Sequence, residues 1–469
     1  VLADSQVTGT RLNSDGERGR GVYAEAGSTV TLEGVLVQDN HEVGVGAHES
    51  DLVIADTRIL DTQLQADGLF GRGLEIYDGS LEASNLRVER NHEVGISLID
   101  ASGVLSSTIV RDTESNGEGD LGLGIALQNS SLRVVDAQVH RNREIGLYLD
   151  ASDVTLDRAH ILDTQSDPRG LLGMGLLAKN HSEVRAVDSW IDRSHECGVC
   201  LVGSRASLTD SRITRTRRSS QTGIGVGVIA QEGSELELDG VELTGSEGPG
   251  LYVMLESTAT GVDCVLHDNA FAGVAVVYGS SLALESSTVT GTRVDANQGG
   301  GVGLYTYDWF EPNQVQITSS TVGNNELAGI YLQGSGSYQF TDNEVSGGPG
   351  FEDVSGRWTH GDGILAMAGY LGTVTGWDPD TRTGLLLEGN TFHDCAGAAV
   401  FLDGSGVRLE DNSYVENGVD VLQQACGELE QPEGLDTEPV ELTEICPSHD
   451  HSTELLDFEI YLEDPNATL

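Results

Sequence analysis

The sequence predicts an all-β protein, a right-handed parallel β-helix of about 15–16 rungs with a small C-terminal cap. The first observation is a glycine followed by an apolar-x-apolar triplet, which returns at alternating intervals of 22 or 23 and 29 residues over the first half of the chain. The second is strand periodicity, because apolar residues alternate over brief runs between Gly, Ser, Asp and Asn. The recurring glycines are Gly21, Gly44, Gly73, Gly95, Gly124, Gly146, Gly175, Gly198, Gly227, Gly250, Gly273, Gly303, Gly329, Gly363 and Gly397.

Each short interval is one rung of about 22 residues that holds three short strands. No stretch keeps the 3.6-residue period of a helix. The long intervals insert six or seven more residues before the glycine, at 63–72, 114–123, 165–174 and 217–226. The repeating unit is therefore two rungs, 51 or 52 residues long. Loops of one kind should project from every second rung, about 9.6 Å apart.

A small polar residue stands three positions after the last apolar residue of each rung. Parallel stacking places these side chains above one another at a turn, where they can bond one another and the turn backbone. We interpret them as a structural ladder. Its members are Asn40, Thr62, Asn91, Thr113, Asn142, Thr164, Ser194, Thr216, Asn269, Thr292 and Asn325.

The repeats divide the chain into a β-helix over 1–420 and a cap over 421–469, since the open edge of a strand stack must be covered. Cys426 and Cys446 lie outside the repeats and are predicted to form a disulfide that closes the cap. Cys197 and Cys200 flank Gly198 at the start of a strand. In an extended chain their side chains lie about 10 Å apart, beyond disulfide reach, so we expect them only to fill space. The chain starts in mid-repeat, which predicts a longer polypeptide or an assembly.

The charge balance is strongly acidic, with 75 acidic and 25 basic residues and a net charge of −50. Such a field repels nucleic acid and anionic membranes, so neither is expected as a partner. No apolar run is long enough to cross a membrane, and no membrane insertion within this chain is expected. No cofactor and no metal site are predicted. Calcium is the one candidate cation, but solvation of the outer surface is the favoured explanation of the charge.

A His-Glu pair recurs at 41–42, 92–93 and 195–196, with Arg143-Glu144 at the fourth equivalent position. A catalytic motif is not expected in several copies along a rod, one of them with arginine in place of histidine. The copies lie about 10 Å apart, too far for direct ligation of one metal ion at about 2 Å. The pattern therefore favours surface turn residues.

Residues 305–377 hold 11 of the 24 aromatic residues, and the largest inserts fall at 306–313, 345–362 and 368–383. Aromatic rings among acids suit sugar stacking or protein contacts. We therefore predict a binding ledge on the loops of 305–383. Its ligand-binding candidates are Tyr307, Trp309, Trp358, Trp377, Asp308 and Asp378. If the ledge is catalytic, the general acid and base are His360 with Asp362 or Asp353.

The strands, the ladder and the Gly-Val or Gly-Ile starts resemble the right-handed parallel β-helix repeat proteins of the pectate-lyase-like superfamily. Gly73-Leu-Glu-Ile76 with Asn91-His-Glu-Val-Gly95, repeated over 51 residues, is similar to uncharacterised secreted bacterial members. The resemblance extends from residue 1 to about 420 and implies a bacterial protein that is secreted or at the cell surface. It implies no single activity, because this fold carries lyases, hydrolases, epimerases and inert stalks.

The sequence thus favours an extracellular or cell-surface scaffold, adhesin-like and non-catalytic, that binds a glycan or a surface protein through 305–383. The alternative is a polysaccharide-active enzyme, a uronate lyase or epimerase, with its site on the same loops. An anionic substrate would meet a protein of charge −50, which opposes the alternative.

Overall fold

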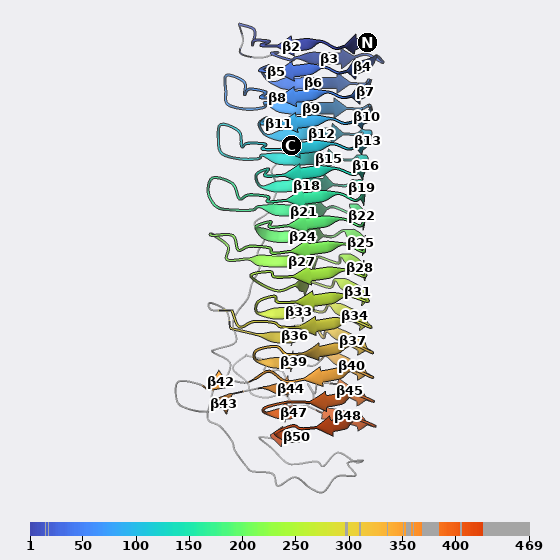
Figure 1. Ribbon diagram of the computed structural model, residues 1–469, viewed down its shortest axis with the longest axis vertical. Helices are drawn as coiled ribbons and strands as arrows, with labels where there is room; N and C mark the ends of the chain where they lie inside the picture. The colour runs from blue at the N-terminus through green and yellow to red at the C-terminus, as the bar shows by residue number, and fades with distance from the viewer. Residues whose placement is uncertain are drawn as a thin grey trace.

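The computed structural model describes residues 1–14, 16, 18–295, 299–308, 311–334, 336–349, 351–352, 358–359, 361–367, 384–403 and 406–424. Over these residues the chain winds into a rod, and each turn gives one strand to each of three parallel sheets (Figure 1). The described residues contain strands and no helix, so none could cross a membrane as a helix. The predicted all-β parallel β-helix is confirmed.

Each sheet has sixteen strands, stacked in chain order. Sheet A comprises β1 (Leu2–Ala3), β4 (Thr29–Glu33), β7 (Asp51–Ala55), β10 (Ser80–Ser84), β13 (Ser102–Ser106), β16 (Ser131–Val135), β19 (Asp153–Asp157), β22 (Glu183–Val187), β25 (Arg205–Thr209), β28 (Glu235–Asp239), β31 (Thr258–Val262), β34 (Ser281–Glu285), β37 (Gln314–Thr318), β40 (Ser337–Thr341), β45 (Gly384–Glu388) and β48 (Gly406–Glu410). Sheet B comprises β2 (Gln6–Thr8), β5 (Leu36–Gln38), β8 (Arg58–Leu60), β11 (Arg87–Glu89), β14 (Ile109–Arg111), β17 (Gln138–His140), β20 (His160–Leu162), β23 (Trp190–Asp192), β26 (Arg212–Thr214), β29 (Glu242–Thr244), β32 (Val265–His267), β35 (Thr288–Thr290), β38 (Thr321–Gly323), β41 (Glu344–Ser346), β46 (Thr391–His393) and β49 (Ser413–Val415).

Sheet C receives the chain after sheet B and returns it to sheet A. It comprises β3 (Val22–Glu25), β6 (Val43–His48), β9 (Arg72–Tyr77), β12 (Val94–Ile99), β15 (Leu123–Gln128), β18 (Ile145–Asp150), β21 (Met174–Lys179), β24 (Glu196–Val202), β27 (Gly225–Gln231), β30 (Leu251–Val253), β33 (Ala272–Val277), β36 (Val302–Tyr307), β39 (Ala328–Gln333), β44 (Asp362–Met367), β47 (Ala398–Asp403) and β50 (Val419–Gln424). A separate antiparallel pair joins β42 (Phe351–Glu352) to β43 (Trp358–Thr359).

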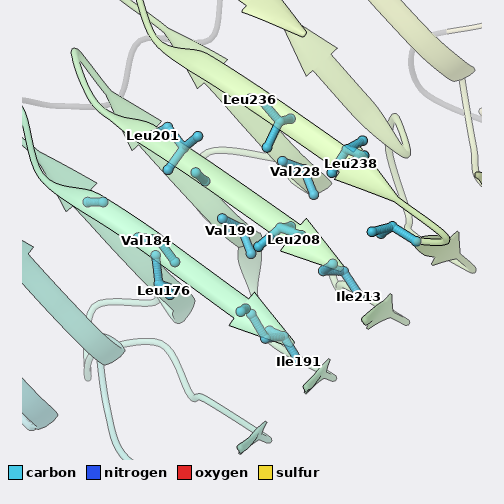
Figure 2. Packing of buried hydrophobic residues seen from close by; sticks show 14 of the residues in the cluster. Leu176, Val184, Ile191, Val199, Leu201, Leu208, Ile213, Val228, Leu236 and Leu238 are labelled. Carbon is cyan, nitrogen blue, oxygen red and sulfur yellow. The ribbon is translucent and has the colours of Figure 1, made fainter. Parts of the chain in front are cut away.

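The core is a continuous apolar column inside the rod. Strands pair in register, so like residues stack: Ile96 lies between Leu74 and Ile125 of the neighbouring rungs. Figure 2 shows three such layers, in which Leu176, Val199 and Val228 of sheet C occupy equivalent positions. Each rung therefore buries its apolar side chains against the rungs above and below it.

The recurring glycine forms the corner where the chain enters sheet C. A Cβ on Gly95 would lie 2.6 Å from the carbonyl oxygen of Gly124 and 2.5 Å from Val110 Cγ1. The bend also places the residues before and two after the glycine on the same outer side: Ile145 and Tyr148 join one apolar cluster there. A larger residue in place of this glycine would push apart two rungs.

The outer face of sheet C carries a second buried apolar cluster, separate from the core column, from Val94 to Leu365. Leu121 and Leu172, from the long-rung loops, pack against its edge. Several tyrosines of this face are buried although they lie outside the core column. Tyr252 and Tyr331 are 3% and 2% exposed.

The long-rung loops project from the corner between sheets B and C, on the left in Figure 1. They touch one another across the intervening short rung. The Gly117 N–H donates to the Gly68 carbonyl at 2.7 Å, and the Ser219 hydroxyl donates to the Gly170 carbonyl at 2.9 Å. The loops are therefore a continuous wall along one edge of the rod.

Regular stacking continues to the end of β50 at Gln424, four residues into the segment predicted as a cap. The rest of the predicted cap, with Cys426 and Cys446, lies outside the described residues.

Candidate functional site

The predicted ledge on 305–383 falls largely outside the part of the chain that the structure describes. This holds for Trp309, Asp353, His360, Trp377 and Asp378, and for the side chain of Trp358, whose backbone lies in β43. Three of the predicted residues are described, namely Tyr307, Asp308 and Asp362.

Asp308 is used inside the fold. Its carboxylate accepts bonds from the Asn313 side chain and, at 3.1 Å, from the Tyr338 hydroxyl, which is itself bonded to the Thr306 hydroxyl. Asn313, Tyr338 and Thr306 are at most 1% exposed. Burial raises the pKa of Asp308 to about 6, although the bond from Tyr338 acts against the rise. Asp308 thus closes the corner between β36 and β37, and Tyr307 packs beside it against the outer cluster of sheet C.

Asp362 also has a structural role. It begins β44, is 6% exposed, and accepts the backbone N–H of Ala398 on the next rung at 2.6 Å. Asp308 and Asp362, two of the three described residues of the predicted ledge, therefore bond groups of a neighbouring rung.

The recurring glutamates of the His-Glu pairs anchor the long loops. Glu93 is 4% exposed and accepts the backbone N–H of Phe70 at 2.7 Å and the Arg72 guanidinium at 3.2 Å. The preceding histidine ring, His92 Nδ1, lies 2.9 Å from the Thr62 carbonyl. The interpretation as surface turn residues was wrong for the glutamates, because the loop folds over them and uses their carboxylates as acceptors.

Glu144 differs from Glu42 and Glu93, whose carboxylates each bind an arginine. It is 6% exposed and accepts the Leu121 N–H at 2.7 Å, but Leu123 stands where Arg72 would bring a guanidinium. Burial raises the pKa of Glu144 to about 8; the Leu121 bond lowers it, and nearby Asp167 raises it further.

The polar ladder lies at the corner between sheets B and C. Each asparagine joins two rungs: Asn142 accepts the Thr113 N–H at 3.1 Å and donates to the Val110 carbonyl at 3.2 Å. The threonine and serine hydroxyls behave differently, because those of Thr62 and Thr113 have no hydrogen-bond partner among the described residues. A second ladder, of serines, lies at the corner between sheets C and A and was not foreseen. Its members include Ser50, Ser130, Ser152, Ser182, Ser204, Ser234, Ser257 and Ser280.

Cys197 and Cys200 form a disulfide, with their Cα atoms 6.1 Å apart. The expectation that they could not pair was wrong. It assumed a straight strand, in which such residues point to opposite faces, but the corner at Gly198 turns both to the outer side of sheet C.

The outward positions of sheet B carry a different chemistry. We define the sheet B face by seven strands of sheet B, namely β8, β11, β14, β17, β20, β23 and β26. It comprises the first and third residues of each of these strands, together with the residue of positive φ that follows each strand. It holds eight of the 25 basic residues but only five of the 75 acidic ones. Its arginines are Arg58, Arg87, Arg90, Arg111, Arg141, Arg193, Arg212 and Arg215, and its acids are Asp61, Glu89, Asp112, Asp163 and Asp192.

Most of these charges form ion-pair networks between rungs. Glu89, 5% exposed, bonds Arg111 at 2.9 Å and Arg90 at 3.2 Å, and Arg90 also bonds Asp61 at 2.7 Å. Beside this network, burial and the nearby positive charges of Arg141 and Arg111 lower the pKa of His140. In this part of the sheet B face the guanidinium groups are held in place by ion pairs, and acidic residues do not outnumber the arginines.

A second network surrounds the one tryptophan of this face. The Trp190 indole N–H donates to the Thr214 hydroxyl at 2.9 Å, and that hydroxyl donates to Asp192 at 2.6 Å. The Asp192 side chain is fully buried and also binds Arg193 and Arg215, each at 2.5 Å. The partly exposed indole is thereby fixed in orientation on the surface, with Arg215 5.9 Å from its ring centre.

Sequence reasoning missed this face because it used the total charge and not the position of each charge. The signal was present: on successive short rungs the residue after the sheet B strand is Arg90, Arg141 and Arg193, whereas on long rungs it is Asp61, Asp112 and Asp163.

A shallow acidic groove of about 570 Å³ lies at the opposite corner, between sheets C and A. Asp51, Asp78, Asp100 and Asp153 line it with serines. Within the described residues no cluster of three or more His, Cys, Asp or Glu side chains is arranged to hold a metal ion, and calcium stays an expectation.

Comparison with known proteins bears on the fold. The family model of the right-handed β-helix region matches residues 3–114 and 204–370, more than half of the chain. Among solved structures, the periplasmic alginate epimerase AlgG is 11% identical, with 80% of this chain and 77% of that chain covered and a TM-score of 0.42. Pectate lyase Pel9A is 11% identical, with 69% and 70% covered and a TM-score of 0.34. The gp42 tailspike of Acinetobacter phage vb_AbaP_AS12 is 12% identical, with 77% and 61% covered and a TM-score of 0.32. No curated protein matches. By its matched residues and its three parallel sheets, the chain belongs to the right-handed β-helix family.

Proposed function

We propose that this protein is a non-catalytic β-helix scaffold, secreted or at the cell surface, that binds a linear anionic glycan along the sheet B face. The observation that carries the proposal is the concentration of arginines, with one fixed tryptophan, on one narrow face of a strongly acidic rod. The predicted ledge on 305–383 is not needed for it.

The charge distribution favours a ligand that lies along the rod. An anionic chain is repelled by the acidic surface as a whole and is attracted where the local balance is basic. An anionic chain is therefore attracted to the sheet B face, although the protein as a whole, with its net charge of −50, repels it.

The spacing favours a ligand with a repeat of its own. Arg90, Arg141 and Arg193 are each two rungs apart, about 9.6 Å. This length is close to that of one disaccharide in an extended polysaccharide. A polymer lying along the rod would meet equivalent guanidinium groups at successive disaccharides.

Trp190 supplies an apolar surface within this charged face. Carbohydrate sites combine aromatic rings with a few placed polar groups. The bonds through Thr214 and Asp192 hold the indole in place before a ligand arrives, which lowers the entropic cost of binding.

Binding to acidic and neutral oligosaccharides of equal length tests the proposal. We expect tighter binding of the acidic ones, weaker binding at higher salt, and a loss of about tenfold in Trp190→Ala. Tyr77→Ala is the matched control, because Tyr77 is an exposed aromatic residue on sheet C, 43% exposed. Equal losses in the two variants, or equal affinity for neutral chains, would contradict the proposal.

The same samples test the enzymatic alternative. A lyase or epimerase would consume a uronate polymer, and a lyase would generate an unsaturated product that absorbs in the ultraviolet. Turnover that persists in Trp190→Ala would favour an enzyme with its site elsewhere on the rod.

A further inference from the structure

Two arginines of the sheet B face form a pair that the fold does not explain. Arg58 of β8 and Arg87 of β11 are direct partners in register, and both are exposed. Adjacent strands lie about 4.8 Å apart, and like charges directly opposite each other destabilise a sheet. In a chain with three times as many acids as bases, an acid could have been placed at either position.

Neither arginine forms an ion pair within the described residues. Their counterparts on the same face each do, with an acid of their own or of a neighbouring rung. These counterparts are Arg90, Arg111, Arg141, Arg193, Arg212 and Arg215.

The acids nearest in sequence are already engaged. Asp56 accepts the Asn85 side-chain N–H at 2.6 Å, and Asp61 accepts the Arg90 guanidinium at 2.7 Å. On the strand of Arg87, the carboxylate of Glu89 is bonded to Arg90 and Arg111. The guanidinium groups of Arg58 and Arg87 therefore keep donors for a ligand.

We propose that Arg58 and Arg87 clamp a tetrahedral oxyanion ester, a sulfate or phosphate group, carried by the bound glycan. This inference rests on the proposed function and names the group that the face recognises. Each guanidinium offers a planar fork of N–H donors, which matches such oxyanions in a bidentate manner. A sulfate ester has three terminal oxygens and can accept from both forks, whereas the two oxygens of a carboxylate are satisfied by one fork.

The position of the pair sets a length requirement. Trp190 lies on β23, four strands beyond β11, which is about 19 Å along the rod. A glycan that stacks on Trp190 and places an ester between Arg58 and Arg87 must span that distance. Shorter oligosaccharides can use one contact or the other.

The test compares two octasaccharide probes at fixed ionic strength by calorimetry, one sulfated and one carrying carboxylates only. The variants are Arg58→Gln/Arg87→Gln and Arg58→Lys/Arg87→Lys. Arg185→Gln/Arg205→Gln is the matched control, because it removes the same charge from exposed positions of sheet A. Competition with inorganic sulfate and inorganic phosphate distinguishes the two esters.

We expect the sulfated probe to bind about tenfold more tightly than the carboxylate probe, and to lose about that factor in the glutamine pair. The lysine pair should lose most of it, since lysine keeps the charge without the fork. The sheet A control should change affinity less than about twofold. The inorganic anion that competes at the lower concentration identifies the ester.

Equal losses in the glutamine pair and the sheet A control would overturn the inference, as would an equal loss for the carboxylate probe. If Trp190→Ala weakens binding while the glutamine pair does not, the inference falls and the proposed function stands. If inorganic sulfate binds through the arginine pair but no oligosaccharide binds, the clamp stands and the glycan function falls.

Discussion

Glu89 and Glu93 lie four residues apart in one rung, and both carboxylates are buried. Glu89, at the end of β11, is held by two arginines and belongs to the sheet B face. Glu93, past the corner, is held by the backbone of a long loop and by Arg72. Between them stands Asn91, whose side chain joins two rungs. The corner therefore separates the charges of the sheet B face, where we propose that a ligand binds, from the charges that anchor the long loops.

The difference shows that recurrence is a poor guide to function in a solenoid. The His-Glu pairs are the most regular of the polar motifs, and their glutamates anchor the long-rung loops. The sheet B face repeats less regularly. Its members that do not recur at a fixed spacing include Arg58, Arg87 and Trp190, the residues that we propose contact a ligand. The two regions should respond to substitution in different ways, the corner through stability and the face through affinity.

The largest effect is expected at the corner glycine. In Gly124→Ala the new Cβ would lie 2.5 Å from the Gly146 carbonyl oxygen and 2.7 Å from Asn142 Nδ2. Since both groups are fixed between rungs, we expect a loss of about 4 kcal/mol in the free energy of unfolding, measured by chemical denaturation. Gly384→Ala is the control, because its nearest atom is 3.6 Å away. Similar losses in both would show that the corner is not specially constrained.

The ladder comes second. Asn142→Ala leaves the Thr113 N–H and the Val110 carbonyl without the bonds that the amide supplies, and we expect a loss of about 3 kcal/mol. Thr113→Val should change stability by less than about 1 kcal/mol, since its buried hydroxyl has no partner among the described residues. If the threonine variant is the less stable one, the ladder is held by hydroxyls and not by amides.

Glu144 gives a pH-dependent effect at the loop anchors. Its pKa in the folded protein, about 8, is above the value of 4.5 for the free side chain. Its contribution is therefore fully favourable below about pH 4.5 and is lost as the pH rises through about 8. Glu144→Gln keeps an acceptor for Leu121 without a charge, so we expect it to be about 2 kcal/mol more stable than the parent at about pH 6, more so at higher pH, and nearly equal to it at about pH 4.5.

Melting at a series of pH values measures this difference. Glu93→Gln provides the contrast, because it removes the partner of Arg72 and should be less stable than the parent at every pH tested. A difference between Glu144→Gln and the parent that does not change with pH would mean that folding leaves the pKa of this carboxyl unchanged.

The fold could be predicted from the sequence because each rung repeats a steric requirement. Gly95 and its equivalents must be glycine because the next rung lies in contact with them. The ladder residues must be polar because they bond buried backbone groups. Both residue types therefore recur in the sequence at a fixed spacing. The Cys197–Cys200 disulfide could not be predicted from strand geometry, because the corner at Gly198 changes the direction of the side chains.

The candidate site was harder to predict for two physical reasons. Surface positions are not fixed by steric contacts, so they leave no regular period in the sequence. Arg58 and Arg87 differ from the other arginines of the face only because they have no acidic partner, and this is visible only once the register of the strands is known. The aromatic residues of 305–383 drew attention by composition, yet Asp308 and Asp362 serve contacts within the rod. The composition of the sequence indicated unusual loops, whereas the structure shows which charged side chains are already bonded within the rod.

The smallest effect on stability is expected on the sheet B face itself. Arg141 is half-exposed and binds Asp112 at 2.7 Å, and such surface pairs contribute less than about 1 kcal/mol. Arg141→Gln should thus leave the denaturation midpoint nearly unchanged while weakening the binding of an acidic oligosaccharide, because Asp112 loses its counter-charge. Asp112→Asn should have the opposite effect on affinity, since it leaves the guanidinium free for the ligand. The affinity of both variants for the acidic oligosaccharide separates the sheet B face from the corner. A ligand-binding face requires affinity changes of opposite sign in the two variants, with stability unchanged. A loss of stability in either variant would instead group Arg141 and Asp112 with the structural residues of the corner.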